Sequence, residues 1–172
     1  LFAAASGVPQ AKWYITSPAA SEEEIEKIES KFSYPIFVKP CNAGSSLGIS
    51  KAGNRAELEK AIAEAAKFDS KILCEEYIDG YEVECAVLGN EDTRASVVGQ
   101  ITPSNEFYDY SAKYIDNASG LTIPANIPEE TAEKIREYAV TVFKALGCRG
   151  MSRVDFFVLR GSGEIKFNEI NT

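Results

Sequence analysis

The spacing of apolar residues along the chain alternates between the period of a helix and that of a strand. Helical spacing predicts three helices, which run from Ser21 to the Tyr34-Pro35 pair, from Asn54 through Ala66, and from Pro128 to about Leu146. Short apolar or alternating runs predict strands at residues 11–15, 36–40, 49–52, 71–77, 81–88, 95–101, 151–160 and 164–171, and residues 102–126 are expected to form a loop. Because strands and helices are mixed and several strands follow one another as hairpins, the pattern indicates an α+β fold.

Length, charge and composition narrow the class of protein. A chain of 172 residues forms one ordinary domain or two small lobes. The net charge of −8 argues against a nucleic-acid or membrane-surface binder, since either presents a basic face, and no apolar run is long enough to cross a bilayer. The sequence contains no histidine, which excludes Ser-His-Asp and Cys-His catalysis and histidine zinc sites. Any chemistry of this chain must therefore use carboxylates, Lys, Arg, Tyr, Ser, backbone amides or metals that prefer oxygen ligands.

The four cysteines, at positions 41, 74, 85 and 148, form no C-x-x-C pair. We expect them to be reduced and buried, as in a cytosolic protein. Cys41 is given no catalytic role because no histidine can activate it. Most aromatic residues of the predicted elements, Tyr77 among them, are expected to lie in the core rather than to contact a ligand.

The last two predicted strands form a hairpin that places charged residues opposite one another. With residues 161–163 as its loop, Asp155 falls opposite Glu169 and Arg153 falls opposite Asn171. Directly opposed residues share one face of a sheet, so these four polar side chains are expected to lie together. The other face of the hairpin is apolar and suits a core.

Two opposed carboxylates repel each other unless a proton or a cation lies between them. Asp155, Glu169 and Asn171 offer oxygen ligands that suit Mg²⁺ or Mn²⁺. The alternative is a solvated polar face on which Arg153 is the counter-ion, and the charges alone favour neither interpretation. A slip of one residue in the register would move Asp155 to the opposite face and remove the site.

Two further segments could contact a nucleotide. Lys39 ends a predicted strand just before residues 41–48, where small residues and glycines could surround phosphate oxygens. The alternative for this segment is a surface turn with an incidental lysine. Residues 74–82 run from a strand into a turn, and their backbone and carboxylates could bind an adenine edge and ribose hydroxyls. The alternative there is an exposed strand end with solvated acids.

Seven short motifs follow one another along nearly the whole chain. They are Val38-Lys39-Pro40, Gly44-Ser45-Ser46-Leu47-Gly48-Ile49, Glu75-Glu76-Tyr77-Ile78-x-Gly80-x-Glu82, Phe107-Tyr108-Asp109-Tyr110-x-Ala112-Lys113-Tyr114, Gly147-Cys148-x-Gly150, Arg153-Val154-Asp155 and Asn168-Glu169-x-Asn171-Thr172. In this order they resemble the D-alanine–D-alanine ligase family of the ATP-grasp superfamily. The resemblance implies two α+β lobes that hold a nucleotide between them. Residues 1–80 would be the central, small lobe, truncated at its start, and residues 81–172 the C-terminal, large lobe, truncated at its end.

The resemblance also implies a reaction and a set of residues. In the family, ATP phosphorylates the carboxylate of one D-alanine, and the amine of the second attacks the acyl phosphate to form D-alanyl-D-alanine for peptidoglycan precursors. The nucleotide would be bound by Lys39, Gly44, Glu75, Glu76, Ile78, Glu82, Phe107 and Lys113. The residues at the reacting groups would be Arg153, which stabilises the oxyanion, Ser45, Ser46 and Tyr114. Two Mg²⁺ or Mn²⁺ ions would be held by Asp155, Glu169 and Asn171.

The choice of second substrate stays partly open. In the family, tyrosine at the position of Tyr114 goes with dipeptide-forming ligases, which leaves D-alanine or D-serine. The alternatives in function are another ATP-grasp carboxylate–amine ligase and a nucleotide-binding module without catalysis. The resemblance implies a cytoplasmic enzyme that acts on D-alanine and ATP, binds neither nucleic acid nor membrane, and is a homodimer in its full-length form. We expect the chain to be a fragment without the family's N-terminal domain and C-terminal end, and to be inactive alone.

Overall fold

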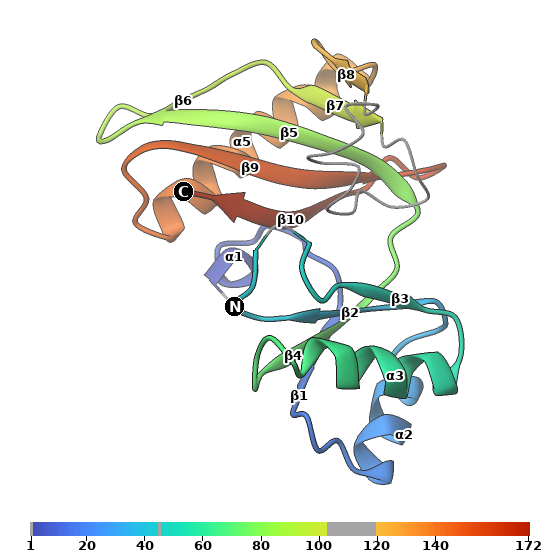
Figure 1. The fold of residues 1–172 in the computed structure, drawn as a ribbon. Helices are drawn as coiled ribbons and strands as arrows, with labels where there is room; N and C mark the ends of the chain where they lie inside the picture. Colours follow the sequence, from blue (N-terminus) through green and yellow to red (C-terminus); the bar gives the residue numbers. More distant parts are fainter. Residues whose placement is uncertain (1, 45, 103–119) are drawn as a thin grey trace. The chain divides into compact units, whose positions relative to one another are not determined.

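The computed structural model describes residues 2–44, 46–102 and 120–172, which belong to two compact units (Figure 1). We call residues 11–77 the small unit, and residues 2–10, 78–102 and 120–172 the large unit. The chain passes from the small to the large unit between Tyr77 and Ile78, whereas the expected boundary lay after residue 80, and residues 2–10 join the large unit. The mixture of helices and antiparallel strands confirms the α+β prediction.

The small unit is built on a sheet whose described strands are all antiparallel, in the order β1-β4-β2-β3. Its elements are β1 (Trp13–Thr16), α2 (Glu22–Lys31), β2 (Ile36–Pro40), β3 (Ser50–Ala52), α3 (Arg55–Ala65) and β4 (Ile72–Glu76). One face of the sheet packs against the two helices, where Ile36 and Val38 of β2 meet Ile28 of α2 and Leu58 of α3, all without exposed surface. The other face of the sheet therefore carries the partly exposed side chains of Phe37 and Lys39 from β2 and of Leu73 and Glu75 from β4.

Both helices of the small unit begin at the residues that the sequence predicts. The Ser21 hydroxyl accepts a hydrogen bond from the Glu24 amide at 3.3 Å, while the Glu24 carboxylate accepts one from the Ser21 amide at 3.0 Å. The Asn54 side chain accepts from the Glu57 amide at 3.0 Å. These bonds satisfy backbone donors that have no partner within the helix, which fixes where each helix starts.

The large unit contains a sheet in the order β10-β9-β5-β7-β8, with β6 paired to β5, among the residues described. Its elements are α1 (Phe2–Ala5), β5 (Gly80–Gly89), β6 (Arg94–Ala95), β7 (Gly99–Thr102), β8 (Gly120–Thr122), α5 (Glu129–Ala145), β9 (Gly150–Leu159) and β10 (Ile165–Asn171). The long helix α5 covers one face of this sheet (Figure 1). Its Ile135 and Phe143 pack among Val83 of β5 and Val154 and Phe156 of β9, all without exposed surface.

Two predictions about strands were wrong in part. The expected strand at 95–101 is divided into β6 and β7. Between them the Ser96 amide donates to the Ala86 carbonyl at 2.8 Å, and the Ser96 hydroxyl accepts from the Ala86 amide at 3.0 Å. Strand β8 lies inside the predicted loop 102–126 and pairs with β7. The aromatic cluster at 107–110 lies outside the described residues.

The closing hairpin confirms the predicted pairing at its charged end but not at its turn. Glu169 lies opposite Asp155 and Asn171 opposite Arg153, as expected. The turn, however, spans residues 160–163 rather than 161–163, since Leu159 and Glu164 form its closing backbone hydrogen bond at 2.9 Å. A β-bulge between Phe167 and Glu169 takes up the one-residue difference.

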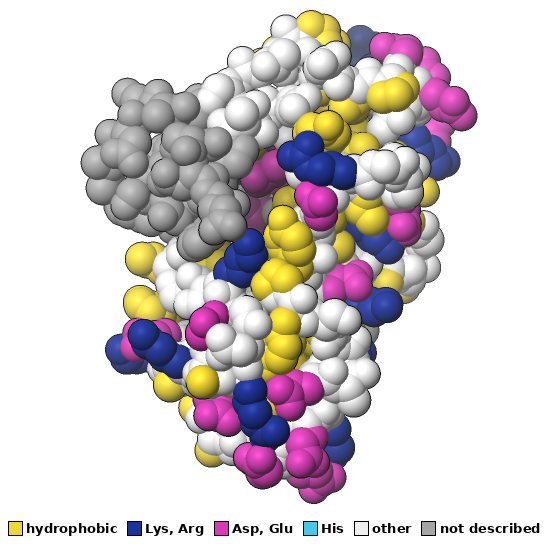
Figure 2. Space-filling model, turned by 90° about the vertical axis from the view of Figure 1, so that its right-hand side faces the viewer, with side chains coloured by type: hydrophobic (Ala, Val, Ile, Leu, Met, Phe, Trp, Pro, Cys, Tyr) yellow, Lys and Arg dark blue, Asp and Glu magenta, His cyan; other side chains and the backbone are white. Residues whose placement is uncertain are grey.

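The four cysteines are free thiols, as predicted. Cys74 and Cys85 are buried as expected, but Cys41 and Cys148 are partly exposed, so the prediction of burial was wrong for these two. Acidic and basic side chains are intermixed over the face shown in Figure 2, so the excess negative charge does not form one continuous patch there. None of the helices in the described part of the chain is both long enough and apolar enough to span a bilayer.

The packing of α5 on its sheet predicts a large effect of Phe143→Ala on stability. Removing this fully buried ring is expected to lower the free energy of unfolding by about 3–5 kcal/mol, because it leaves a cavity between helix and sheet. Leu146→Ala, at the exposed end of the same helix, is the control and should change it by less than about 1 kcal/mol. Chemical denaturation measures both, and equal effects of the two variants would contradict this account of the core.

Candidate functional site

Asp155 lies in the middle of β9 with only 2% of its surface exposed, and its charge is satisfied by two neighbours on the same face. Arg153 donates from Nε to Oδ1 and from Nη2 to Oδ2, both at 2.8 Å. Asn171 donates from Nδ2 to Oδ2 at 3.1 Å. A carboxylate has four lone-pair positions, so these three bonds leave one acceptor position on Oδ1.

A third carboxylate, Glu84 of β5, completes a row across three adjacent strands. The register places Glu84 directly opposite Asp155 on one side, and Glu169 opposite Asp155 on the other. Glu84 Oε2 also lies 3.1 Å from Arg153 Nε. Glu84 was not among the predicted site residues, because pairing within the last hairpin does not show that β5 is the other neighbour of β9.

The charges of this row are unequal and partly buried. Glu84, Asp155 and Glu169 carry three negative charges against the single positive charge of Arg153, which leaves an excess of two. Burial, assisted by the negative charge of Asp155, raises the pKa of Glu84 even though Arg153 acts to lower it. The hydrogen bonds to Asp155 raise the pKa of the Arg153 guanidinium above its ordinary range. The arrangement favours binding of additional positive charge.

The structure can be compared with the two interpretations of the polar face around Asp155, a metal site or a solvated face with Arg153 as the counter-ion. Among the described residues no group of three or more His, Cys, Asp or Glu side chains is already arranged to hold a metal ion. Asp155 is neutralised by Arg153, so the counter-ion interpretation describes this carboxylate in the present structure. Glu169 is exposed and faces the same side, so the donor set keeps carboxylate oxygen available for a cation.

In the small unit, Lys39 and Glu75 are brought together on the sheet face opposite the helices. Lys39 Nζ lies 2.5 Å from Glu75 Oε2, and about a fifth of each side chain is exposed. The two come from neighbouring strands, since Lys39 of β2 pairs with Leu73 and Glu75 of β4 pairs with Phe37. A half-buried ion pair of this kind leaves the lysine able to exchange its carboxylate partner for another anion.

Tyr77 was expected in the core, and this prediction was wrong. Its side chain is 41% exposed, and its ring stacks on Phe37 with centroids 6.1 Å apart and an interplanar angle of 14°. Lys51 Nζ lies 4.8 Å from the centre of the ring. The alternation of residues 73, 75 and 77 was the signal available in the sequence, because it places Tyr77 on the face of Glu75.

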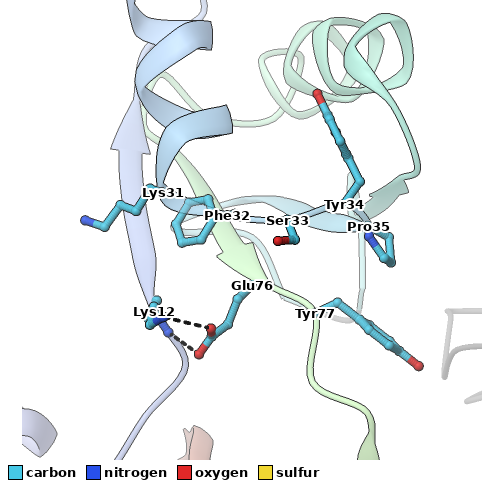
Figure 3. A pocket seen from close by; sticks show the side chains of 8 residues that line it. All are labelled: Lys12, Lys31, Phe32, Ser33, Tyr34, Pro35, Glu76 and Tyr77. Atoms are coloured by element: carbon cyan, nitrogen blue, oxygen red, sulfur yellow. Dashed lines mark hydrogen bonds and ion pairs between the residues drawn. The ribbon is translucent and has the colours of Figure 1, made fainter.

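Glu76 points to the other side of β4 from Tyr77 (Figure 3). Its carboxylate accepts a hydrogen bond from the Lys12 amide at 2.9 Å and lies 3.9 Å from Lys12 Nζ. These two residues form one wall of a pocket of about 240 Å³ that also contacts Phe32 and Pro35. The structure therefore does not bring the Glu76 carboxylate together with Lys39 and Glu75.

The described residues between β2 and β3, 41–44 and 46–49, contain neither helix nor strand, in keeping with the loop predicted at 41–48, and β3 starts one residue later than expected. Leu47 donates its amide to the Gly44 carbonyl at 3.2 Å, and Ser46 adopts a φ of 60°, which is uncommon for residues other than glycine. Gly44 and Ser46 thus lie in one tight turn, and Ser45 lies outside the described residues. Backbone amides in such a turn suit the binding of anionic oxygens.

The remaining predicted site residues divide into those that the structure describes and those that lie outside the described residues. Glu82 of β5 lies two positions before Glu84, on the same face of the large unit as Asp155, and Ile78 precedes this strand with a partly exposed side chain. Phe107, Lys113 and Tyr114 lie outside the described residues. The large unit therefore gathers Glu82, Arg153, Asp155, Glu169 and Asn171 on one face, while the small unit gathers Lys39 and Glu75.

Comparison with known proteins gives one consistent answer. Residues 2–172 match the family described as D-ala D-ala ligase C-terminus. The D-alanine–D-alanine ligase of Acetivibrio thermocellus is 58% identical over 171 residues, which are 97% of this chain and 46% of that protein. The enzyme of the same name from Caldicellulosiruptor bescii is 50% identical over 96% of this chain and 47% of its own length. The chain thus spans about half the length of the curated relatives it matches.

Solved structures agree with the sequence comparison. The VanG D-Ala:D-Ser ligase from Enterococcus faecalis superposes with a TM-score of 0.89 at 42% identity, covering 99% of this chain and 50% of that one. The D-alanine–D-alanine ligase from Coxiella burnetii gives a TM-score of 0.82 at 31% identity over 99% of this chain and 44% of that one. With a family match over almost every residue and relatives at this level of identity, the chain belongs to the D-alanine–D-alanine ligase family and has its ATP-grasp fold.

Proposed function

We propose that this chain supplies the nucleotide-binding and metal-binding part of an ATP-dependent ligase that joins two D-alanines to D-alanyl-D-alanine through an acyl phosphate. The observation that carries the proposal is the face of the large unit where Glu84, Asp155 and Glu169 surround Arg153 in a chain of this family. The identity of the amino acid follows from the names of the relatives. We further propose a cytoplasmic enzyme whose full-length form is a homodimer.

The donor set of the large unit fits Mg²⁺ or Mn²⁺. Asp155 retains one acceptor position, and Glu169 is exposed. The Asn171 side chain uses its nitrogen to donate to Asp155, so its oxygen can act as a metal ligand. The excess of two negative charges offsets the charge of one divalent cation, and nucleotide phosphates would offset the charge of a second. Asp155, Glu169 and Asn171 would hold two such ions, which neutralise phosphate charge during transfer when they are bound.

The cationic side chains account for the remaining needs of phosphoryl transfer, which depends on position and charge rather than on a protein base. Arg153 is held rigidly by Asp155 and would stabilise the oxyanion of the tetrahedral intermediate. Lys39 would bind phosphate oxygens after exchanging its Glu75 partner, which frees Glu75 to accept from the adenine amino group. In this scheme Glu82 binds the ribose, and the amides around Gly44 and Ser46 contact the phosphates.

A D-alanine–D-serine ligase is the second candidate. It is favoured by one observation, the TM-score of 0.89 at 42% identity to a protein that is named a D-Ala:D-Ser ligase. Both candidates use the same nucleotide chemistry and differ in the second substrate. Tyr114, which the family resemblance associates with dipeptide products, is compatible with either.

The full-length protein is expected to release phosphate from ATP when D-alanine is added and to form D-alanyl-D-alanine. Phosphate is measured colorimetrically and the dipeptide by mass spectrometry, with D-alanine alone and with D-alanine plus D-serine. A dominant D-alanyl-D-serine product would select the second candidate. Equal phosphate release with L-alanine, or with no amino acid, would refute both.

Glu169→Gln is expected to lower kcat by about 100-fold or more, because it removes an anionic oxygen ligand from the cation site. The loss should be most severe at limiting Mg²⁺, and the rate is measured across a Mg²⁺ titration. Glu164→Gln, on the same hairpin but paired with Lys166 at 2.7 Å, is the matched control and should keep the parental rate. A Glu169→Gln enzyme with near-normal turnover at low Mg²⁺ would remove Glu169 from the site.

A further inference from the structure

The connection between α3 and β4, residues 66–71, contacts the start of the glycine-bearing loop through Asp69. Asp69 Oδ2 accepts hydrogen bonds from both the backbone amide and the side-chain Nδ2 of Asn42, each at 2.8 Å. Its other oxygen accepts from the Lys71 amide at 3.1 Å. The Cys41 amide donates in turn to the Lys71 carbonyl at 3.0 Å. One carboxylate thus joins Asn42, near the start of the loop, to the segment that leads into β4.

The same connection also contacts the far end of the loop, through Phe68. Gly48 has a φ of 73°, and a Cβ added there would lie 2.7 Å from the Phe68 ring. Phe68 itself is 51% exposed, so its ring covers the loop rather than filling the core of the unit. Adjacent residues of one short segment therefore contact the loop near both of its ends, at Asn42 and at Gly48.

Asp69 is chemically suited to hold Asn42 in a fixed position. Its backbone hydrogen bond from Lys71, with further bonds from Asn42, lowers the pKa of Asp69, so the carboxylate is ionised at neutral pH. Ionised acceptors form stronger hydrogen bonds than neutral ones. The Asp69 amide is itself tied to the end of α3, through the Ala65 carbonyl at 3.2 Å. The attachment point is therefore a fixed part of the scaffold.

We propose that Asp69 is a positioning residue for nucleotide binding: it fixes Asn42 and thereby sets where the backbone amides that follow Lys39 and Pro40 are presented to phosphate oxygens. The inference rests on the proposed use of ATP by this site. A loop whose ends are already fixed loses less conformational freedom when it binds a ligand, so the attachment raises affinity without touching the nucleotide. Asp69 acts through Asn42 and is not a catalytic residue.

The test compares Asp69→Ala, Asn42→Ala and the double variant with the parent, using the full-length protein. Direct binding of ATP·Mg²⁺ by calorimetry and the KM for ATP should both weaken about tenfold in Asp69→Ala, the scale of a lost charge-assisted hydrogen bond. Asn42→Ala keeps its backbone bond to Asp69 and should weaken ATP binding less. Because the two residues act through one contact, the double variant should bind no more weakly than Asp69→Ala.

Glu64→Ala is the matched control, since Glu64 is a partly exposed acid near the end of α3 that pairs with Lys67 instead of the loop. It should keep the parental ATP affinity. Because Asp69 accepts three hydrogen bonds, its loss is expected to lower the melting temperature by a few degrees. The KM for D-alanine should stay unchanged in every variant, which a general loss of structure would not allow. Should Asp69→Ala prove unstable, hydrogen exchange at the amide of residue 42 in Asn42→Ala still tests the attachment, because that amide should remain protected.

Unchanged ATP affinity in Asp69→Ala, strictly additive effects in the double variant, or an unprotected amide in Asn42→Ala would overturn the inference. These results are separable from failure of the proposed function, which shows as parental protein that releases no phosphate in response to D-alanine. Calorimetry with ATP·Mg²⁺ reports on Asp69 whichever amino acid the enzyme uses.

Discussion

The candidate site depends on the placement of a nearly buried carboxylate in the centre of a sheet. Asp155 occupies a position on β9 with strands on both sides, where water cannot fully solvate its charge. An ionised group in such a place must be paired and hydrogen-bonded. Arg153, two residues away on the same face, meets this need with two bonds at 2.8 Å, and its own position is fixed in return. The Arg153 guanidinium, which is proposed to stabilise an oxyanion, is therefore held in place before any substrate binds.

In each unit the cationic side chain of the candidate site is paired with carboxylates. Lys39 pairs with Glu75 in the small unit, and Arg153 pairs with Asp155 and Glu84 in the large unit. Under the proposed function, phosphate oxygens would compete for the cationic side chain of each unit, and divalent cations would compete for the carboxylates of the large unit. Such binding would exchange ion pairs within each unit for ion pairs with the ligand, which would lower the cost of removing these charges from water. The excess of carboxylates in the large unit makes this exchange favourable for a cation.

The sequence predicts those parts of the site that depend on neighbouring residues, such as helix caps and the alternation within one hairpin. It does not predict contacts that depend on pairing with a strand distant in the sequence. Capping residues and apolar spacing place α2 and α3, and alternation within one hairpin puts Asp155 opposite Glu169. Glu84 could not be assigned because its role requires knowing that β5 pairs with β9, a contact between residues about seventy positions apart. Tyr77 was misplaced for a related reason: a tyrosine at a strand end is buried or exposed according to which strand lies beside it, here the strand of Phe37.

The β-bulge of β10 explains how a turn with a different length from the predicted one still yields the predicted site. From the turn to Phe167, the pairing of β10 with β9 is displaced by one residue relative to the expected register. Continued without interruption, it would place Asn168 opposite Asp155 and turn Glu169 toward the apolar face that α5 covers. The bulge restores the alternation, and it occurs where the Phe167 amide donates to the Pro9 carbonyl at 2.7 Å on the free side of the strand. This contact with the N-terminal segment fixes Phe167, the last residue before the bulge, so a segment from the other end of the chain adjoins the point where the register that aligns the two carboxylates is restored.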